Sequence, residues 1–511
     1  MKGLDTRART GILVGALAMF FALDVAFIVS LAGVPFAPLS LGQAIIEVLP
    51  GWISIPLIEL FQHWAQRLLV IGVVALYLAS GTIAGIAALD PGRRDRVVVS
   101  LAVAPWLLTV VLAQLFAAAH LELGALLVDA GAGLAVFAAS LALLRSAGQY
   151  RVPVPAPSRR RALYATFGVA ALVAFGGLKL GPSLRIARAA GENVVATARN
   201  LVFRETVPPP DPQFEKIERL TPRITANADH YTVDTTLFKP QVDTARWTLA
   251  IRGNVEQPFE LTYDELLELP SVEQLHTLEC ISNEVGGDLI STALWTGVPL
   301  RDLLARAKPK NGAFDVILRS VDDYSDSIPI AKALEAKTIV AYLMNGVTLP
   351  IDHGFPARLL VPNIYGMKNV KWLKTVEVAT FDYFGYWQER GWNDAAIVNV
   401  GSRFDAPVRT VRWDGGQVAV AGIAFAGARG ISKVEVSVDG GQPWVVAELE
   451  TALGALTWRR WLYRWTPDGV GPKKLLVRAT DGAGLTQTAV RREPFPSGAT
   501  GYDTIEIQVV R

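Results

Sequence analysis

The sequence has one cysteine, Cys280, within Thr-Leu-Glu-Cys-Ile-Ser-Asn-Glu-Val-Gly-Gly-Asp at residues 277–288. This pattern predicts an accessible thiol at the end of a strand, followed by a polar loop. A lone cysteine is often only a small core residue, and that alternative stays open here. The chemical alternatives are a soft metal ligand, or a nucleophile whose base would be His230, His276 or His353. With no second cysteine, an internal disulfide is excluded and a zinc site is disfavoured.

Three further motifs follow the cysteine loop: Trp-Thr-Gly-Val-Pro-Leu at 295–300, His-Gly-Phe-Pro-Ala-Arg at 353–358, and Gly-Met-Lys-Asn-Val-Lys-Trp-Leu at 366–373. Their order and spacing resemble the sulfite oxidase family of molybdopterin-dependent oxidoreductases, in its membrane-anchored bacterial branch. The resemblance covers residues 215–400 as the α+β molybdopterin-binding domain. Residues 401–511 resemble the family's immunoglobulin-like partner domain.

The resemblance implies that Cys280 is the catalytic residue, binding molybdenum through its thiolate beside the two dithiolene sulfurs of the pterin. The metal would carry the two-electron step. His353, Arg358 and Lys371 match positions that hold the pterin phosphate, where fixed cations suit an anion. The other cofactor contacts that the resemblance implies are Asn227, His230, Tyr231, Ser320, Asn369 and Val370. Taken singly, each is an ordinary surface or core residue type.

The sequence departs from the family where sulfite would bind. Sulfite oxidases have an arginine in place of Ala226, two arginines in place of Glu284 and Val285, and a tyrosine in place of Trp392. Charged hydrogen bonds to an oxyanion are worth about 1.5–3 kcal/mol each, so losing these guanidinium groups disfavours sulfite. The site instead resembles the branch that includes methionine-sulfoxide reductases. A small-molecule or protein sulfoxide is therefore an expected substrate, and the residues leave the direction of the reaction open.

The first 183 residues have the composition of a membrane domain. The chain is 51% hydrophobic with a mean hydropathy of +0.32, and its long uncharged stretches precede residue 185. Five stretches approach the roughly 20 apolar residues that a membrane-spanning helix needs. They lie at residues 12–32, 68–89, 97–119, 121–144 and 162–180. The segment 41–64 contains Pro50 and Pro56, which predicts an interfacial or re-entrant piece rather than a sixth crossing.

Basic clusters predict the orientation of these spans. Lys and Arg gather before the first span, between the second and third, and between the fourth and fifth, as expected of loops retained in the cytoplasm. Five spans then place the rest of the chain outside the cytoplasmic (inner) membrane, so the catalytic domain is expected to be extracytoplasmic. Residues 158–163, Ser-Arg-Arg-Arg-Ala-Leu, resemble an internal twin-arginine export signal, or are only a positive-inside anchor.

Polar residues in the membrane half raise the possibility of an electron-transfer site. Asp24 and Asp129 lie within spans, where a carboxylate is costly unless it is paired or neutral. His63 and His120 fall near the outer span ends and could bind a haem b iron or contact a quinone, although interfacial histidine is the commoner role. No Cys-x-x-Cys-His motif exists, so covalent haem is excluded. Nucleic acid is not an expected partner, because 49 basic and 47 acidic residues are interspersed.

The soluble half is expected to begin after a spacer. Residues 184–214 contain Pro-Pro-Pro-Asp-Pro at 208–212, typical of an extended linker. Strand-like runs alternate with helix-like stretches at 263–269 and 300–307, which predicts an α+β domain over 215–400. After residue 401 the sequence turns to strands alone, separated by turns such as Asp-Gly-Gly at 439–441, which predicts a β-sandwich.

The leading hypothesis is a membrane-anchored molybdopterin oxidoreductase that exchanges electrons with quinol or a cytochrome and contacts membrane lipid. The alternative is a cofactor-free binding or adhesion module on a membrane anchor, because fold does not fix function. A transporter with an external receptor domain is a third idea.

Overall fold

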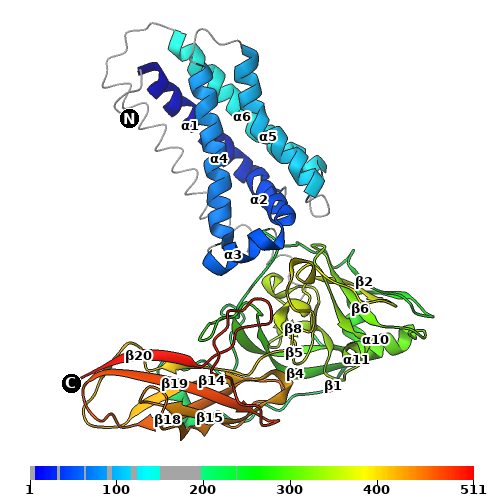
Figure 1. Ribbon diagram of the computed structural model, residues 1–511. Coiled ribbons are helices and arrows are strands. Elements are labelled where there is room, and N and C mark those ends of the chain that lie inside the picture. The colour runs from blue at the N-terminus through cyan, green and yellow to red at the C-terminus, as the bar shows by residue number, and fades with distance from the viewer. Residues whose placement is uncertain are drawn as a thin grey trace. The chain divides into compact units, whose positions relative to one another are not determined.

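The computed structural model describes residues 6–30, 35–61, 65–88, 95–116, 123–149, 197–237 and 239–511. They form two compact units: one comprises Met1–Asn193 with Thr235–Phe238, and the other comprises Val194–Asp234 with Lys239–Arg511. Figure 1 shows the first as blue to cyan helices and the second as green to red strands with short helices.

The first unit is helical. Its helices are α1 (Thr6–Ser30), α2 (Ala37–Val48), α3 (Gly51–Phe61), α4 (Ala65–Ala88), α5 (Asp95–Phe116) and α6 (Leu123–Gln149). Helices α1 and α4 pack backbone to backbone, since a Cβ on Gly15 would lie 2.0 Å from the carbonyl oxygen of Gly81. Small residues at such a crossing are typical of helix pairs in membranes.

Within the described ranges, three helices are long and apolar enough to cross a membrane by length and composition: Thr10–Ser30, Ala65–Ala88 and Leu123–Ala142. They coincide with the first, second and fourth predicted spans. At the third predicted span, α5 contains Pro105, and its apolar part, Val103–Phe116, is shorter. The fifth predicted span, the arginines at 159–161, His63 and His120 lie outside the described residues. The count of five spans therefore stays a prediction.

The helical unit has an apolar exterior and a polar interior contact. Leu115 and Ile71 expose 67% and 60% of their surface, which suits contact with lipid better than with water. Asp129 is fully buried, and its Oδ2 accepts a hydrogen bond from the backbone N–H of Ala37, 2.7 Å away at the start of α2. Tyr77 and Thr109 share a buried hydrogen bond between α4 and α5.

The other unit begins with two sheets. The first has the order β1-β4-β5-β8-β10, with β9 beside β8, and the second has the order β3-β2-β11-β6-β7. The strands of the first are β1 (Leu201–Phe203), β4 (Ser271–Glu279), β5 (Ile290–Pro299), β8 (Ile339–Met344), β9 (Val347–Thr348) and β10 (Arg358–Leu360). Those of the second are β2 (Thr248–Gly253), β3 (Phe259–Thr262), β6 (Asp315–Ser320), β7 (Ser325–Pro329) and β11 (Leu373–Val378). The helices are α8 (Pro212–Glu215), α9 (Tyr263–Glu268), α10 (Leu300–Ala307) and α11 (Ile330–Ala333).

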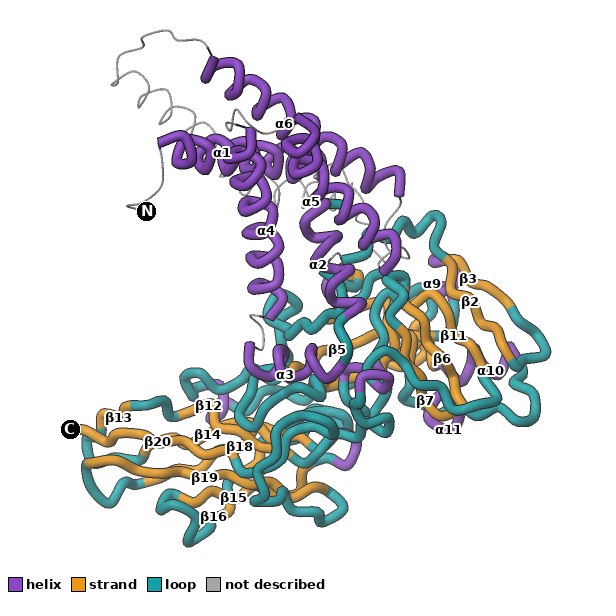
Figure 2. Tube along the Cα trace, turned by 45° about the horizontal axis from the view of Figure 1, so that its top comes forward, coloured by secondary structure: helices purple, strands orange, loops and turns teal. Residues whose placement is uncertain are grey.

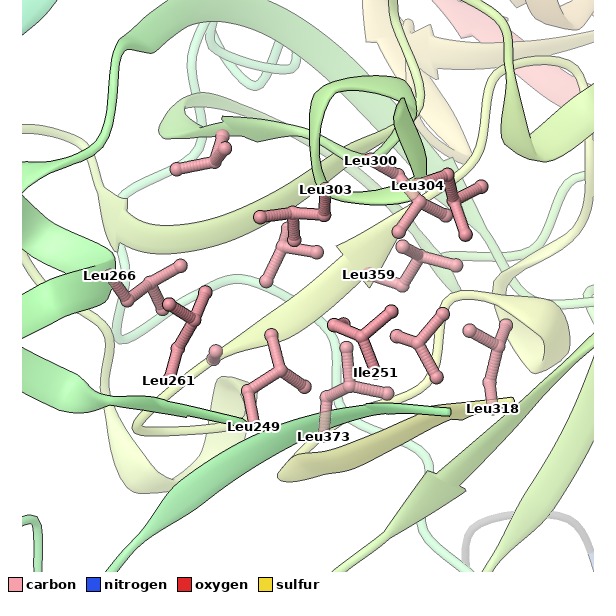
Figure 3. Packing of buried hydrophobic residues seen from close by; sticks show 14 of the residues in the cluster. Leu249, Ile251, Leu261, Leu266, Leu300, Leu303, Leu304, Leu318, Leu359 and Leu373 are labelled. Carbon is pink, nitrogen blue, oxygen red and sulfur yellow. The ribbon is translucent and has the colours of Figure 1, made fainter. Parts of the chain in front are cut away.

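The main core lies between these sheets and their helices. Figure 3 shows Leu300, Leu303 and Leu304 of α10 above Leu359 of β10 and Ile251 of β2. The i, i+3, i+4 spacing puts the three leucines on one face of the helix. This core includes residues of β5, β8, β10 and β11, and β10 begins with Arg358 of the candidate site.

The predicted linker is wrong in its described part. Within residues 197–214, β1 pairs in parallel with β4, and Leu201 lies opposite Ser271. Arg199 also bridges Asp264 and Glu268 at 2.8 and 3.2 Å. A strand that completes a sheet edge satisfies its backbone groups there, so this stretch belongs to the catalytic unit rather than to a free spacer.

The C-terminal part has two antiparallel-rich sheets that share one core. Their orders are β12-β14-β18-β17 and β13-β20-β19-β15-β16. The strands are β12 (Gly401–Ala406), β13 (Thr410–Arg412), β14 (Val418–Phe425), β15 (Ile431–Ser437), β16 (Val445–Val446), β17 (Glu448–Leu449), β18 (Arg459–Trp465), β19 (Gly471–Asp481) and β20 (Asp503–Val510). Figure 2 shows these strands in orange with teal loops. Val420 and Trp461 of one sheet pack with Val434 and Val477 of the other. The immunoglobulin-like topology stays a prediction.

Candidate functional site

Cys280 follows β4 directly and begins a tight loop. Its N–H donates to the carbonyl of Leu289 at 2.9 Å, and its own carbonyl accepts from the N–H of Asn283 at 3.0 Å. The Asn283 side chain accepts from the N–H of Leu289, also at 3.0 Å, which closes the loop. The predicted strand end is therefore present. The prediction of an accessible thiol is wrong, because Cys280 is only 8% exposed where the loop folds back over it.

The surroundings of the thiol favour its protonated form. Burial raises the pKa of Cys280, while the hydroxyl of Ser282, 3.0 Å from Sγ, lowers it. In the described part of the chain, Sγ has no hydrogen bond to a histidine nitrogen, so the nucleophile–base alternative lacks its geometry. A bound soft metal ion would hold the sulfur deprotonated.

Two histidines meet edge to face beside a buried tryptophan. The rings of His230 and His353 lie 5.0 Å apart, and His230 meets the ring of Trp295 edge-on at 5.7 Å. His353 ends the short helix η3 (Ile351–His353), and its Nε2 lies 2.8 Å from the carbonyl oxygen of Asn227. The Asn227 side chain accepts from the Asn345 amide at 2.7 Å. These contacts bring His230, His353 and Asn227 together from segments more than 100 residues apart.

Arg358 connects this histidine pair to the loop before β11. It is buried, and its two terminal nitrogens donate to the carbonyls of His353 and Asn369, both at 3.1 Å. The side-chain oxygen of Asn369 accepts from the N–H of Val361 at 2.7 Å, and the carbonyl of Val370 accepts from the N–H of Leu359 at 2.9 Å. The backbone around residues 369–370 is therefore fixed against the strand that begins with Arg358.

Lys371 adds a second buried cation. Its ammonium group pairs with Asp234 and donates to the carbonyls of Val233 and Asp352 at 3.3 and 3.2 Å. Burial lowers the pKa of Lys371, and the Asp234 carboxylate partly opposes that shift. The same ammonium group lowers the pKa of Cys280, which indicates that the cation is close enough to influence the thiol.

Two glycines allow the site to close up. Gly354 has φ +110°, and a Cβ there would lie 3.0 Å from the Cβ of Lys371 and 3.1 Å from that of Arg358. A Cβ on Gly366 would lie 2.7 Å from the Tyr231 hydroxyl and 3.3 Å from the carbonyl oxygen of Glu279. Only glycine fits in either place without displacing backbone or cofactor-site side chains.

The cations of this site lack enough carboxylates to balance them. Burial, together with the charge of Arg358, lowers the pKa of His230 to about 3 and that of His353 to about 4. Burial also lowers the pKa of Arg358 to about 10. Nε2 of His230 and Nε of Arg358 are buried and have no hydrogen-bond partner among the residues that the structure describes. Buried polar atoms are normally satisfied, so the Nε–H of Arg358 fits an anionic group such as the phosphate of molybdopterin. Nδ1 of the neutral His230 faces the Tyr231 carbonyl at 3.2 Å, which leaves its Nε2 as an acceptor for a donor on the same cofactor.

The structure therefore brings most of the predicted site residues together. Ser320 is the exception: it ends β6, and its hydroxyl is engaged by the carbonyl of Trp372 and the N–H of Asp322, both at 3.4 Å. Among the described residues, no group of three His, Cys, Asp or Glu side chains could hold a metal ion. A metal at Cys280 would need further ligands from its cofactor.

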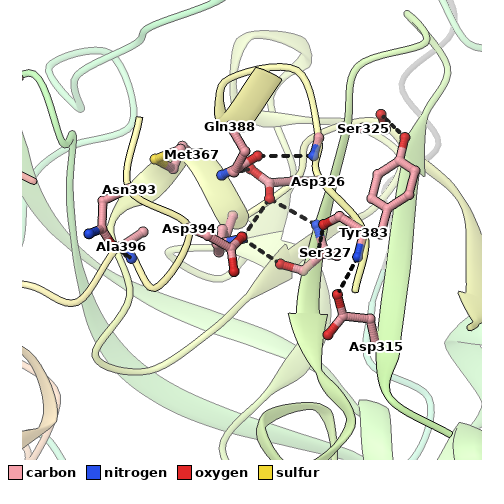
Figure 4. A network of polar contacts seen from close by, with 12 residues as sticks. Asp315, Ser325, Asp326, Ser327, Met367, Tyr383, Gln388, Asn393, Asp394 and Ala396 are labelled. Carbon is pink, nitrogen blue, oxygen red and sulfur yellow. Dashed lines mark hydrogen bonds and ion pairs between the residues drawn. The ribbon is translucent and has the colours of Figure 1, made fainter. Parts of the chain in front are cut away.

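Sequence reasoning missed an ionic network beside the site. The buried Lys368 pairs with Asp326 at 2.8 Å and with Asp394 at 2.9 Å (Figure 4). The available signal was a lysine inside the motif at 366–373 without an assigned role. Glu279, next to the thiol, was also missed, and burial raises its pKa to about 7.

A cavity of about 50 Å³ lies beside the thiol loop. Glu279, Asn283, Glu284 and Arg403 line it, together with residues of β12 and β14. Arg403 is already engaged, because it donates to Asp405 at 3.0 Å and to the carbonyl of Gly287 at 2.5 Å. Two carboxyl groups therefore face this space against one occupied guanidinium group.

Trp392, which stands where sulfite oxidases have a tyrosine, is part of an aromatic cluster. Trp392 is buried, and its ring contacts those of Trp387 and Phe495 edge-on at 6.1 and 5.3 Å. Its indole N–H has no hydrogen-bond partner. Ala226 is exposed and adds no cation.

Comparison with known proteins agrees with this chemistry. The family described as "Oxidoreductase molybdopterin binding domain" matches residues 236–387, and the one described as "Mo-co oxidoreductase dimerisation domain" matches residues 396–491. These two matches identify the two segments as domains of a molybdopterin-binding oxidoreductase.

Individual relatives show which molybdopterin oxidoreductases the chain is similar to. The chain is 34% identical to mitochondrial sulfite oxidase of Mus musculus over 43% of this chain and 49% of that protein. It is 30% identical to the nitrate reductase [NADH] of Solanum lycopersicum over 48% of this chain and 34% of that protein. The sulfane dehydrogenase SoxCD of Paracoccus pantotrophus has a similar fold, with a TM-score of 0.50 and 23% identity over 56% of this chain and 82% of that one. Over residues 236–491 the chain is therefore similar to molybdenum enzymes of the sulfite oxidase family. It spans about half the length of the mouse relative that it matches.

Proposed function

We propose that this protein is a membrane-anchored, extracytoplasmic molybdopterin oxidoreductase that transfers an oxygen atom to or from a substrate other than sulfite. The observation that carries the proposal is the buried Arg358 guanidinium, whose Nε–H has no hydrogen-bond partner among the described residues, beside the Lys371 ammonium group and a lone thiol. This combination suits a phosphate-bearing cofactor whose metal takes one sulfur from the protein.

Each residue has a distinct part in this proposal. Cys280 binds the metal, and its loop, closed by Asn283, keeps water from the sulfur. Arg358, Lys371 and His353 hold the phosphate, while the backbone at Asn369 and Val370 contacts the pterin. Asn227, His230 and Tyr231 would make the other contacts to the cofactor. Ser320 is a further candidate for such a contact. The bound molybdenum cofactor supplies the two-electron redox step.

The substrate is proposed to be a neutral oxygen-atom donor or acceptor, such as a small-molecule or protein sulfoxide. Glu279 and Glu284 face the cavity beside the thiol loop, and its one guanidinium group is paired with Asp405. A dianion such as sulfite would lose its hydration there without gaining free cations.

The helical unit is proposed to anchor the enzyme in the inner membrane and to exchange electrons with it. Three apolar helices support anchoring. The positive-inside pattern supports an extracytoplasmic catalytic unit, and haem b or a quinone near His63 and His120 would link it to quinol or a cytochrome.

The test is metal and pterin analysis of the full chain made in a host that synthesises molybdopterin. We expect about one molybdenum per chain, lost in Cys280→Ser, with reduction of a sulfoxide exceeding oxidation of sulfite. Protein without molybdenum would contradict the proposal. Turnover of sulfite ahead of sulfoxides would contradict its substrate part.

A further inference from the structure

Lys368 lies in a network that the proposed cofactor contacts do not use. Its side chain is 3% exposed, and the ammonium group donates to Asp326 Oδ1 and to the carbonyl of Ser327, both at 2.8 Å, and to Asp394 Oδ1 at 2.9 Å. Three donors have three acceptors, so the cation has no proton left for a ligand. Any role it has in the reaction must therefore act through its neighbours.

Asp326 is the centre of the network. Figure 4 shows Asp326, Ser327, Gln388 and Asp394 converging from separate segments. Besides Lys368, the Asp326 carboxylate accepts from the N–H of Ser327 at 2.8 Å, the Tyr324 hydroxyl at 3.1 Å and the Gln388 amide at 3.4 Å. A fully satisfied buried network of this kind holds its segments in a single arrangement.

The first segment that Lys368 holds is the cofactor loop, residues 366–371. The residue after Lys368 is Asn369, whose carbonyl accepts a hydrogen bond from the Arg358 guanidinium at 3.1 Å. The residue before it is Met367, whose carbonyl accepts from the Tyr324 hydroxyl at 2.8 Å. The loop is thus held on both sides of the lysine, by Tyr324 of the network before it and by Arg358 after it.

The second segment is the aromatic segment, residues 386–394. Gln388 and Asp394 both come from it, and Trp392, at the position of the family's tyrosine, lies two residues before Asp394. Lys368 therefore bridges the loop that holds the cofactor and the segment that carries a residue of the proposed substrate side.

We infer that Lys368 is a positioning residue that sets the spacing between the cofactor loop and the aromatic segment, through Asp326 and Asp394. This inference rests on the proposed molybdopterin site. Removing the ammonium group leaves two carboxylates without their cation, so the cofactor loop shifts. Removing only the Asp394 charge leaves the loop tied to Asp326 but frees the aromatic segment.

The experiment compares full-length variants by molybdenum per chain and by the electron paramagnetic resonance spectrum of the half-reduced metal. Lys368→Met should retain about tenfold less molybdenum and give an altered spectrum, as loss of supporting contacts commonly does at metal sites. Lys368→Arg keeps the cation and should recover most of both. Asp394→Asn, at a side chain that is 41% exposed, should fold, keep its molybdenum and shift the spectrum.

The matched control is Arg460→Met, which breaks a buried pair with Glu450 at 2.6 Å in the C-terminal sheets. It should lower the melting temperature without changing the spectrum of the retained metal. Equal molybdenum loss and spectral change in the control, or a wild-type spectrum in Asp394→Asn, would overturn the inference. Wild-type protein without molybdenum would instead overturn the proposed function.

Discussion

Gly354 is the residue at which the space around the cofactor cations is tightest. We expect Gly354→Ala to lose molybdenum about tenfold or more, because the new methyl group would push Lys371 and Arg358 apart. Gly312, with φ +83° and open space around it, is the control for backbone strain alone. Gly312→Ala should destabilise the protein by about 1–2 kcal/mol without losing metal. Equal molybdenum loss in both variants would show that strain, not crowding, is responsible.

Three buried histidines predict that the cofactor-free protein is sensitive to acid. Burial lowers the folded-state pKa of His230 and His276 to about 3 and of His353 to about 4, whereas an unfolded histidine titrates near 6.5. The unfolded state therefore binds more protons below that value. The stabilisation that these neutral histidines contribute is fully present above about pH 6.5. It is lost as the pH falls toward their folded-state pKa values, by about 2 kcal/mol per histidine between pH 7 and 5.

Melting temperature against pH, on protein from a host without molybdopterin, measures this loss. His230→Gln should flatten the curve by about one histidine's share. A melting temperature that stays constant between pH 7 and 5 would mean that these side chains are not buried as described.

At the scale of elements, α10 links the core to the strands of the site. Leu304 is fully buried there, so Leu304→Ala should cost about 2–5 kcal/mol of unfolding free energy. Arg301, on the same helix with a side chain that is 49% exposed, supplies the control, and Arg301→Ala should change it by less than about 0.5 kcal/mol. Denaturant unfolding followed by tryptophan fluorescence gives both values. Similar losses in the two variants would contradict the assigned face of α10.

The elements with local signals were predictable from sequence. The stretch 300–307 is α10 as predicted, and the strand before Cys280 ends where the polar loop begins. Hydrophobic periodicity and turn residues carry that information within a few positions. The pairing of β1 with β4 joins residues that are about 70 positions apart in the sequence, and no local sequence pattern predicts it.

The same distinction applies to the site. The resemblance indicated His353 and Arg358 from one short motif, and they do lie in contact. The Lys368 network escaped prediction because Asp326 and Asp394 are 42 and 26 residues away from the lysine. Burial of Cys280 also escaped, since it depends on how its loop folds back rather than on the residues that the loop contains.

At the scale of the whole molecule, the proposed sidedness can be tested with single cysteines. Cys280→Ser gives a chain without thiols. In that background, Ala483→Cys, at an exposed turn, should react with a membrane-impermeant maleimide on intact spheroplasts, because the catalytic unit is proposed to be outside. Ala156→Cys, in the basic stretch proposed to be cytoplasmic, should react only after lysis. The reverse pattern would contradict the orientation.

The solitary, buried thiol also affects how long the cofactor-free protein stays able to bind its metal. Burial raises the pKa of the sulfur, and the chain has no second cysteine with which it could form an internal disulfide. Oxidants attack thiolates far faster than buried thiols. A chain without cofactor should therefore survive in an oxidising compartment with its ligand sulfur intact, so late metal insertion would still find a usable site.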